Sequence, residues 1–135
     1  MNDCIFCKII KEEIPCNKIY EDNNIIAFLD IAPVNPGHTL VVPKKHSINM
    51  LDTPEETLKE LIAITKKLLP AIEAATNAKG FNIHINNNEI AGQAVHHIHL
   101  HIIPRFKNDG RKLWKGSEYK GNEAEILTKS ISSNL

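Results

Sequence analysis

The sequence has no excess of charge of either sign and no long hydrophobic run. Its 135 residues include 16 basic and 16 acidic side chains, which cancel to a formal net charge of zero. A protein that binds nucleic acid by neutralising phosphates normally has a clear basic excess, so this balance argues against that class. The longest apolar runs, such as residues 25–29 and 39–42, are far shorter than the roughly 20 residues of a membrane-spanning helix. We therefore expect neither nucleic acid nor a membrane as a partner.

Internal repeats, low-complexity tracts and linkers are also absent from the sequence. A chain of this length matches one domain, because domains average roughly 150 residues, and it is long enough to bury a core without disulfide bonds. Hydrophobic residues make up 42% and charged residues 24% of the chain, values typical of globular proteins. We expect a single domain over residues 1–135.

Cysteine is scarce, and its three residues are an odd number near one end, which does not suit a closed set of disulfide bonds. The N-terminus has neither a basic segment nor a long apolar segment, so it predicts no export signal and a cytoplasmic location. In a reducing cytosol the Cys-x-x-Cys pair of Cys4 and Cys7 is typical of metal or redox chemistry. Two small buried side chains at this spacing are the alternative. Cys16 has no role that we can assign.

Several short segments have the composition of β-strands. Residues 19–21 and 25–30 are apolar and aromatic runs separated by a turn-forming Asp-Asn-Asn, which predicts a hairpin. Residues 38–43 are rich in β-branched side chains and end at a proline, which predicts a third strand. Residues 81–86 and 96–104 alternate between apolar and polar side chains, which is typical of half-buried strands.

Between these strands the hydrophobic period changes to that of a helix. Residues 53–56 read Thr-Pro-Glu-Glu, which predicts a capping box with proline at the first helical position. Leucine and isoleucine then recur every three or four residues; Pro70 is expected to kink this helix, and residues 79–80 to end it. A short helix is predicted over residues 123–130. One long helix and hairpin-linked strands predict an α+β domain with a mainly antiparallel sheet and the helix packed on one face.

Histidine is abundant, and four of the seven histidines lie within six consecutive residues. In an extended strand His97, His99 and His101 point to one face, and the apolar residues between them point to the other. Same-face neighbours lie ~7 Å apart, so one imidazole can attack an electrophile while the next reaches a leaving group or a charged oxygen. The alternatives are a solvated polar face and a metal site formed by all three histidines. The strict alternation that places all three on one face favours a reactive site. We expect His96 to pack on the apolar face or at its edge, and His84 to be solvated.

Residues 97–103 read His-Ile-His-Leu-His-Ile-Ile, which is similar at every position to the signature of the histidine triad (HIT) nucleotide-binding proteins. Residues 4–10, 28–31, 36–44 and 92–105 also resemble that family, most of all its zinc-bearing, Hint-type branch common in bacteria. The resemblance implies a HIT-like fold with a mainly antiparallel five-stranded sheet, one long helix and a short C-terminal helix. It also implies a homodimer formed through the long helix and an edge strand.

The resemblance implies hydrolysis through a covalent nucleotidyl-histidine. His99 matches the nucleophile that attacks the α-phosphorus, and His101 and His38 match groups that contact the phosphate oxygens. The implied substrates are purine nucleoside 5′-phosphoramidates or aminoacyl adenylates, cleaved to a nucleoside monophosphate such as adenosine monophosphate. A dinucleoside polyphosphate hydrolase is the alternative enzyme. Two alternatives involve little or no catalysis. One is a purine-nucleotide-binding regulatory protein with little turnover, which is favoured by Ala94 where many relatives carry a hydroxyl. The other is a metal-handling protein.

The same resemblance assigns binding residues. Apolar side chains of the N-terminal third match a slot for the base, and Asp30 matches the carboxylate that accepts from the ribose hydroxyls. Asn86 and Gln93 match positions near the phosphate, although a turn-favouring role is an equal alternative for Asn86. The full binding set is Ile5, Phe6, Ile9, Phe28, Asp30, Ile31, His38, Asn86, Gln93, Ala94, Val95, His99 and His101.

Zinc-bearing members of the family close a tetrahedral site with two N-terminal cysteines and two histidines. The matching residues here are Cys4, Cys7, His46 and His97. A Cys₂His₂ set with no open position is a structural site by the usual rule. The resemblance therefore implies one structural Zn²⁺ that holds the N-terminal segment on the catalytic strand.

Overall fold

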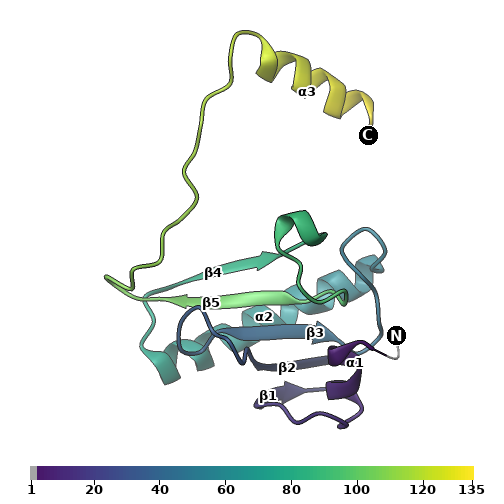
Figure 1. Cartoon of the computed structure of the whole chain (residues 1–135), viewed down its shortest axis with the longest axis vertical. Helices are drawn as coiled ribbons and strands as arrows, with labels where there is room; N and C mark the ends of the chain where they lie inside the picture. The colour runs from purple at the N-terminus through teal and green to yellow at the C-terminus, as the bar shows by residue number, and fades with distance from the viewer. Residues whose placement is uncertain (1–2) are drawn as a thin grey trace.

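The computed structural model describes residues 3–135, and its centre is one five-stranded antiparallel sheet (Figure 1). The strand order is β1-β2-β3-β5-β4, and each neighbouring pair is antiparallel. The predicted α+β class with a five-stranded sheet, one long helix and a short C-terminal helix is confirmed. The strands are β1 (Lys18–Glu21), β2 (Ile25–Leu29), β3 (Thr39–Pro43), β4 (Gly80–Ile85) and β5 (Leu100–Arg105), and the helices are α1 (Ile5–Ile10), α2 (Glu55–Thr76), the short 3₁₀ helix η1 (Glu89–Ala91) and α3 (Glu123–Ser133).

The predicted hairpin is formed by β1 and β2, and a carboxylate closes its turn. Asp22 accepts hydrogen bonds from the backbone N–H groups of Asn24 and Ile25 at 2.7 and 2.8 Å. An aspartate side chain in this position replaces backbone partners that the tight turn cannot supply. The third strand ends at Pro43, as its sequence predicts.

The start and the end of α2 differ from the prediction. The Thr53 hydroxyl donates to the backbone carbonyl of Asn49 and lies 2.8 Å from the Ser47 hydroxyl, so it holds the preceding loop and does not cap the helix. Pro54 occupies the N-cap position, and the predicted capping box is wrong. The helix continues through Pro70 and ends at Thr76, because Asn77 adopts the left-handed conformation (φ 60°) that terminates helices.

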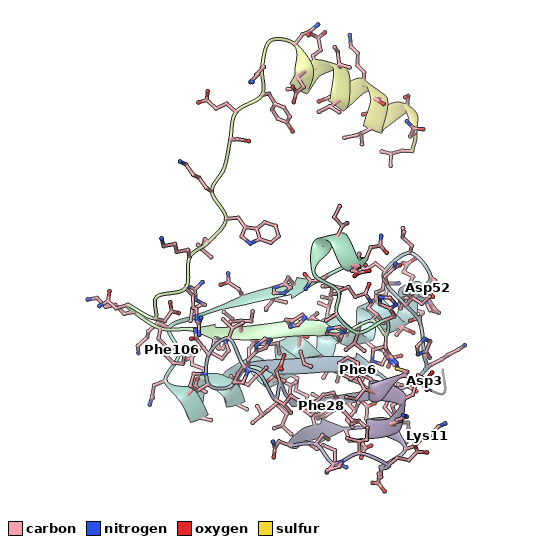
Figure 2. All side chains as sticks on the ribbon, in the orientation of Figure 1. Asp3, Phe6, Lys11, Phe28, Asp52 and Phe106 are labelled. Carbon is pink, nitrogen blue, oxygen red and sulfur yellow. The ribbon has the colours of Figure 1, made fainter. Side chains whose placement is uncertain are left out.

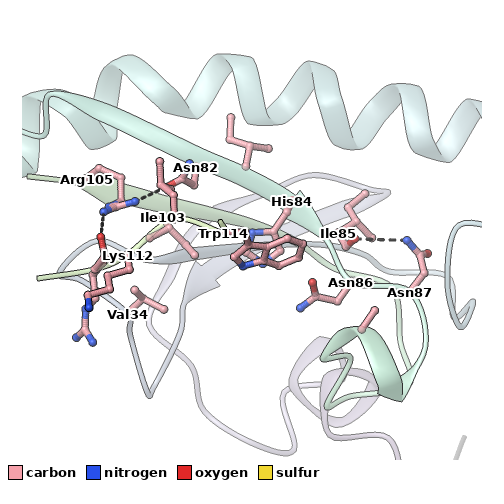
Figure 3. Close-up of a pocket in the computed structure, with 14 residues that line it drawn as sticks. Val34, Asn82, His84, Ile85, Asn86, Asn87, Ile103, Arg105, Lys112 and Trp114 are labelled. Atoms are coloured by element: carbon pink, nitrogen blue, oxygen red, sulfur yellow. Dashed lines mark hydrogen bonds between the residues drawn. The ribbon is translucent and has the colours of Figure 1, made fainter. Parts of the chain in front are cut away.

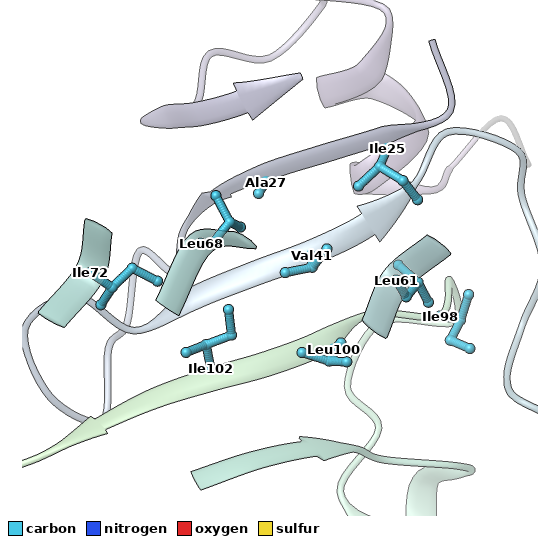
Figure 4. Packing of buried hydrophobic residues seen from close by; sticks show 9 residues of the cluster. All are labelled: Ile25, Ala27, Val41, Leu61, Leu68, Ile72, Ile98, Leu100 and Ile102. Atoms are coloured by element: carbon cyan, nitrogen blue, oxygen red, sulfur yellow. The ribbon is translucent and has the colours of Figure 1, made fainter. Parts of the chain in front are cut away.

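Two apolar layers lie on opposite faces of the sheet. On one face, α2 packs its buried leucines and isoleucine against the strands (Figure 4). On the other face, α1 packs Phe6 and Ile9 against β2 and β3, and the rings of Phe6 and Phe28 meet edge to face at 5.6 Å (Figure 2). Burial of such a side chain contributes roughly 1.5–3 kcal/mol. The first layer comprises Ile25, Ala27, Val41, Leu61, Leu68, Ile72, Ile98, Leu100 and Ile102.

The C-terminal segment leaves the sheet after β5. Figure 1 shows an extended stretch that leads to α3, which stands apart from the sheet and has no buried residue. The predicted short helix over residues 123–130 is confirmed, and it extends to Ser133. Across residues 3–135, no helix combines the length and the apolar composition that a bilayer crossing requires.

Candidate active site

The histidine-rich segment lies mostly before β5 and only partly within it. The strand begins at Leu100, so the strand predicted from residue 96 is too long at its start. The pairing with β3 stops at Leu100, and the backbone N–H of Ile98 donates instead to the Ser47 carbonyl of the loop after β3, at 2.9 Å. The alternation still holds, because Ile98 and Leu100 join the α2 layer while His99 and His101 lie on the opposite side. His96, expected to pack, is exposed.

A chain of hydrogen bonds sets the protonated nitrogen of His101. The backbone N–H of Val34 donates to Nδ1 of His38 at 3.0 Å, so the neutral His38 ring carries its proton on Nε2. That Nε2 lies 2.9 Å from Nδ1 of His101, which therefore accepts. The His101 proton is then on Nε2, which is buried and has no hydrogen-bond partner within residues 3–135. A buried N–H without a partner is available to an anionic oxygen of a ligand.

His99 has the opposite arrangement of its two nitrogens. Its Nδ1 donates to the backbone carbonyl of His97 at 2.8 Å, which leaves the Nε2 lone pair free. The ring centroids of His99 and His101 lie 4.8 Å apart, and Phe6 contacts His99 edge to face at 5.0 Å. The site therefore presents one nucleophilic nitrogen beside one hydrogen-bond donor.

Burial keeps these imidazoles neutral. It lowers the pKa of His99 and of His38, although the Asp30 carboxylate, 3.7 Å from Nε2 of His38, partly opposes the change at His38. Burial, together with the neighbouring histidines, lowers the pKa of His101 to about 3. A neutral ring is the nucleophilic form of imidazole, so the Nε2 lone pair of His99 is available at neutral pH.

A second cluster lies next to this site. One donor atom from each of Cys4, Cys7, His46 and His97 falls within 4.8 Å of the others. The distances from Nδ1 of His97 to Sγ of Cys4, Sγ of Cys7 and Nδ1 of His46 are 3.4, 3.6 and 3.1 Å. Tetrahedral zinc with usual bond lengths separates its ligand atoms by about 3.3 to 3.6 Å, or slightly more between two sulfurs. The four side chains therefore fit a zinc ion.

The tautomer of His97 agrees with that fit. Its Nε2 donates to the backbone carbonyl of Pro43 at 2.7 Å, which turns the Nδ1 lone pair toward the cysteines. Burial lowers the pKa of His97 to about 4, so the ring is neutral and able to ligate. Burial and the neighbouring Cys4 raise the pKa of the Cys7 thiol.

The structure brings together only part of the predicted base slot. Phe6, Ile9 and Phe28 are buried in the α1 layer, and Phe6 contacts His99. Ile31 is 90% exposed, and Ile5 is also exposed, so neither packs with the others here. Asp30 lies beside His38, with Oδ2 3.7 Å from His38 Nε2 and Oδ1 accepting from the backbone N–H of Ala32.

The predicted phosphate-side residues lie on the loop between β4 and β5. The Gln93 amide is buried and donates to the carbonyls of Ile48 and Val95, so its side chain supports the loop. Asn86 Nδ2 donates to the carbonyl of Gly92 at 3.3 Å. Ala94 is exposed, and Val95 packs against the α1 layer.

One histidine of the site was not predicted to belong to it. His84 of β4 stands opposite His101 of β5, and the two rings stack with centroids 4.6 Å apart. It lines a cavity of about 600 Å³ together with Asn86 and Trp114 (Figure 3). Alternation along the strand predicts that His84 shares a face with Asn82 and Asn86. It does not predict that β4 pairs with β5, and this pairing is what brings His84 to His101.

Comparisons with known proteins agree with this geometry. A family model described as the HIT domain matches residues 11–108. The adenosine 5′-monophosphoramidase of Schizosaccharomyces pombe is 39% identical over 135 residues, covering 98% of both chains. An adenylylsulfatase of Arabidopsis thaliana is 42% identical over 125 residues, covering 93% of this chain and 62% of that protein.

Solved structures are similar along almost the whole chain. A HIT family protein of Bacillus subtilis has a TM-score of 0.89 and 41% identity, with 98% of this chain and 97% of that chain covered. A zinc-bound histidine triad family protein of Mycobacterium smegmatis has a TM-score of 0.79 and 35% identity, with 98% of both chains covered. The zinc reported for that protein agrees with the Cys₂His₂ cluster described above.

Proposed function

The chain belongs to the HIT family of nucleotide hydrolases, and on this premise we propose that it cleaves purine nucleoside 5′-phosphoramidates or aminoacyl adenylates to the nucleoside monophosphate. The observation that carries the proposal is the pair of fixed tautomers at His99 and His101. A free lone pair and an unpartnered N–H lie on adjacent rings with centroids 4.8 Å apart. This arrangement matches the needs of a nucleophile and of a donor to a phosphate oxygen.

In the first step, Nε2 of His99 attacks the α-phosphorus. The N–P bond forms as the bond from phosphorus to the leaving nitrogen or oxygen breaks, and the leaving amine takes a proton from water. The histidine ring becomes cationic, and its Nδ1–H bond to the His97 carbonyl stabilises that charge. The Nε2–H of His101 donates to a non-bridging oxygen of the phosphate. His38 orients the His101 ring through the hydrogen bond from its Nε2 to Nδ1 of His101.

In the second step, water attacks the phosphorus of the nucleotidyl-histidine. The new P–O bond replaces the P–Nε2 bond, the water loses a proton to solvent, and His99 regains its lone pair. Two displacements through a covalent intermediate replace one harder substitution. The products are the nucleoside monophosphate and the free amine or, from an aminoacyl adenylate, the free amino acid.

Intact-protein mass spectrometry tests this function. The protein is mixed with an adenosine 5′-phosphoramidate and quenched in acid-free denaturant within the first turnover. We expect a covalent adduct of one adenylyl group per chain, together with release of adenosine monophosphate. A protein that binds adenosine monophosphate but neither forms the adduct nor releases product would contradict hydrolysis and favour the regulatory alternative.

Adenylyl sulfate is the second candidate substrate, because the Arabidopsis relative is an adenylylsulfatase. Its sulfate leaving group needs no proton on departure, which suits a site where Ala94 offers no hydroxyl. Dinucleoside polyphosphates are the third candidate. The ratio of the kcat/KM values for the three substrate types decides among them.

For nucleotide binding, we propose that Phe6, Ile9 and Phe28 contact the base, and that Asp30 accepts from the ribose hydroxyls. Support comes from the position of Phe6 beside His99, from the packing of Ile9 and Phe28 in the same layer, and from the position of Asp30 beside His38. Ile5 and Ile31 would contact the base at the exposed rim of this slot. Asn86, Gln93, Ala94 and Val95 would border the phosphate from the loop before β5.

We also propose that Cys4, Cys7, His46 and His97 hold one structural Zn²⁺. The ion would join α1, which carries the base-side residues, to the segment that carries His99. Its four ligands leave no position for substrate, so the chemistry stays with the histidines.

We propose that the protein forms a homodimer. α3 exposes Ile126, Leu127 and Ile131, and an isolated helix of 11 residues is marginal in water. β4 is an end strand of the sheet, so one of its edges remains unpaired and open to a second copy. Sedimentation equilibrium should give twice the chain mass, and removal of α3 should weaken the association; a full-length monomer at all concentrations would contradict the proposal.

A further inference from the structure

His84 is the fourth imidazole in contact with the reactive cluster. It pairs directly with His101 across β4 and β5, so both side chains project from the same face of the sheet. The two ring planes are 22° apart at a centroid distance of 4.6 Å, which is a stacked contact. The contacts of His101 with His38 and His99 are tilted, at 47° and 56°. Only His84 lies flat against the ring of His101.

A flat contact supplies a constraint that the hydrogen bond of His101 does not. The bond from His38 holds Nδ1 of His101, but a ring held at one nitrogen can still tilt about that bond. The opposite nitrogen, Nε2, has no hydrogen-bond partner in the described part of the chain. A stacked ring restricts the plane of its neighbour, and therefore the direction of the Nε2–H group.

We propose that His84 is a positioning residue that holds the His101 ring with its Nε2–H directed at the phosphate oxygens of the substrate. The inference rests on the proposed function, which supplies those oxygens. His84 acts through His101 and needs no contact with the substrate itself. His84 is exposed, as the sequence predicts, but partial desolvation lowers its pKa, so its ring is neutral at pH 7 and does not repel His101. Its outer side lines the cavity near Asn86 and Trp114, which explains why a polar ring is tolerated there.

Two substitutions separate positioning from proton transfer. His84→Ala removes the ring, and His84→Phe keeps a flat ring without a titratable nitrogen. For hydrolysis of an adenosine 5′-phosphoramidate, we expect the alanine variant to lower kcat about three- to tenfold. KM should change by less than about twofold, because the nucleotide contacts are elsewhere. The phenylalanine variant should recover at least about half of the wild-type kcat.

Ile83→Ala is the matched control. Ile83 is the preceding residue of the same strand, is 42% exposed and points to the other face, so its loss tests β4 without touching the stack. We expect its kcat to equal that of the wild type. A wild-type kcat for His84→Ala, or equally low kcat values for His84→Ala and His84→Phe, would overturn the positioning role.

A second measurement does not depend on turnover. Nitrogen-15 NMR of the imidazole rings reports which nitrogen of His101 carries the proton and whether the ring exchanges between orientations. The wild type and His84→Phe should give the pattern of a single tautomer protonated on Nε2, whereas His84→Ala should give averaged shifts. If the wild type hydrolyses none of the proposed substrates while this NMR difference is present, the proposed function fails and the positioning of His101 stands. Unchanged His101 shifts in His84→Ala would overturn the inference whatever the activity.

Discussion

The two faces of the sheet are built from the same strands but hold different kinds of side chain. The α2 face is a continuous apolar layer without a titratable group in its core cluster. The opposite face combines an apolar patch under α1 with a row of imidazoles from β4, from β5 and from the residues just before β3 and β5. Alternation along each strand allows this division, because neighbouring residues point to opposite faces. One face therefore supplies stability, and the other can hold buried polar groups.

The two faces differ in the interactions that their buried side chains require. Apolar side chains of the α2 face require only exclusion of water. Each imidazole of the other face requires hydrogen bonds, because a buried polar group without a partner is costly. His38, His97 and His99 find their partners in backbone groups, and His101 keeps one nitrogen free for a ligand. Changes on the two faces should therefore affect different measured quantities.

The largest effect is expected at the nucleophile. His99→Asn should reduce turnover of an adenosine 5′-phosphoramidate by about a thousandfold or more and abolish the adduct, because no lone pair remains to attack. Binding of adenosine monophosphate and zinc content should change little, since ground-state contacts remain. His101→Asn is the comparison variant and should slow turnover while still forming some adduct. A His99 variant that forms adduct at the wild-type rate would place the nucleophile elsewhere.

Removal of the metal should loosen the α1 side of the sheet selectively. A bound ion stabilises the native state by about 4 kcal/mol when its free concentration is a thousandfold above its Kd. Elemental analysis should give about one zinc per chain, and chelation should lower Tm. Hydrogen exchange should then increase in α1 before it increases in α2. The zinc proposal fails if metal-free protein melts at the same temperature as the purified protein.

A cavity on the α2 face should change stability without changing chemistry. Leu61 is fully buried, so Leu61→Ala should lower the free energy of unfolding by about 2–5 kcal/mol. The kcat of the folded protein should remain close to that of the wild type, because the site is on the other face. Ile62→Ala is the control: the neighbouring side chain is 57% exposed, and its loss should cost well under about 1 kcal/mol. Urea unfolding measures both, and equal losses would contradict the assignment of the core.

Asp30 tests the sugar side of the proposed nucleotide site. Asp30→Ala should weaken ribonucleotides more than their 2′,3′-dideoxy analogues, since a hydrogen bond to a charged group contributes about 1.5–3 kcal/mol. That range is a factor of roughly ten to a hundred in Kd. Calorimetric titration of both ligands gives the comparison. Equal weakening of both would assign Asp30 to the support of His38 and not to the ribose.

The smallest expected effect is the acid sensitivity of the imidazole face. The pKa of His101 falls from its usual 6.5 to about 3 on folding, so the unfolded chain binds the proton more readily. Stability from this group is complete above pH 6.5 and decreases as the pH drops toward 3, by up to about 1.4 kcal/mol per pH unit. Urea unfolding of wild type and His101→Asn at pH 7.5 and 5.5 checks this. The variant should lose less stability between the two values; parallel losses would show that other groups cause the dependence.

Local patterns were sufficient for the five strands, the long helix and the C-terminal helix, but they predicted neither α1 nor η1. Asp22 closes the predicted hairpin, Pro43 ends the predicted strand, and alternation separates Ile98 and Leu100 from His99 and His101. These features depend on interactions between residues close in sequence or on burial of one face. The family resemblance added the Cys₂His₂ set, whose donor atoms the structure brings within 4.8 Å.

Contacts between distant segments could not be read from local pattern. Thr53 matched a capping box, but its hydroxyl donates to the Asn49 carbonyl, because Ser47, Asn49 and Thr53 are buried within a loop whose other residues are mostly exposed. Gln93 matched a phosphate-side position, yet its amide holds two carbonyls of the surrounding loops. In both cases a buried backbone group without a partner competes for the side chain.

By itself, therefore, the sequence determined the alternation of inward and outward residues along the strands and the positions of the strands and the two longer helices, because hydrophobic periodicity and turn chemistry act over a few residues. The tertiary structure alone decided which nitrogen of each histidine carries the proton. That choice depends on Val34 beside His38, on His38 beside His101 and on the Pro43 carbonyl beside His97. An imidazole accepts or donates with either nitrogen, so only its partners in space select the reactive form.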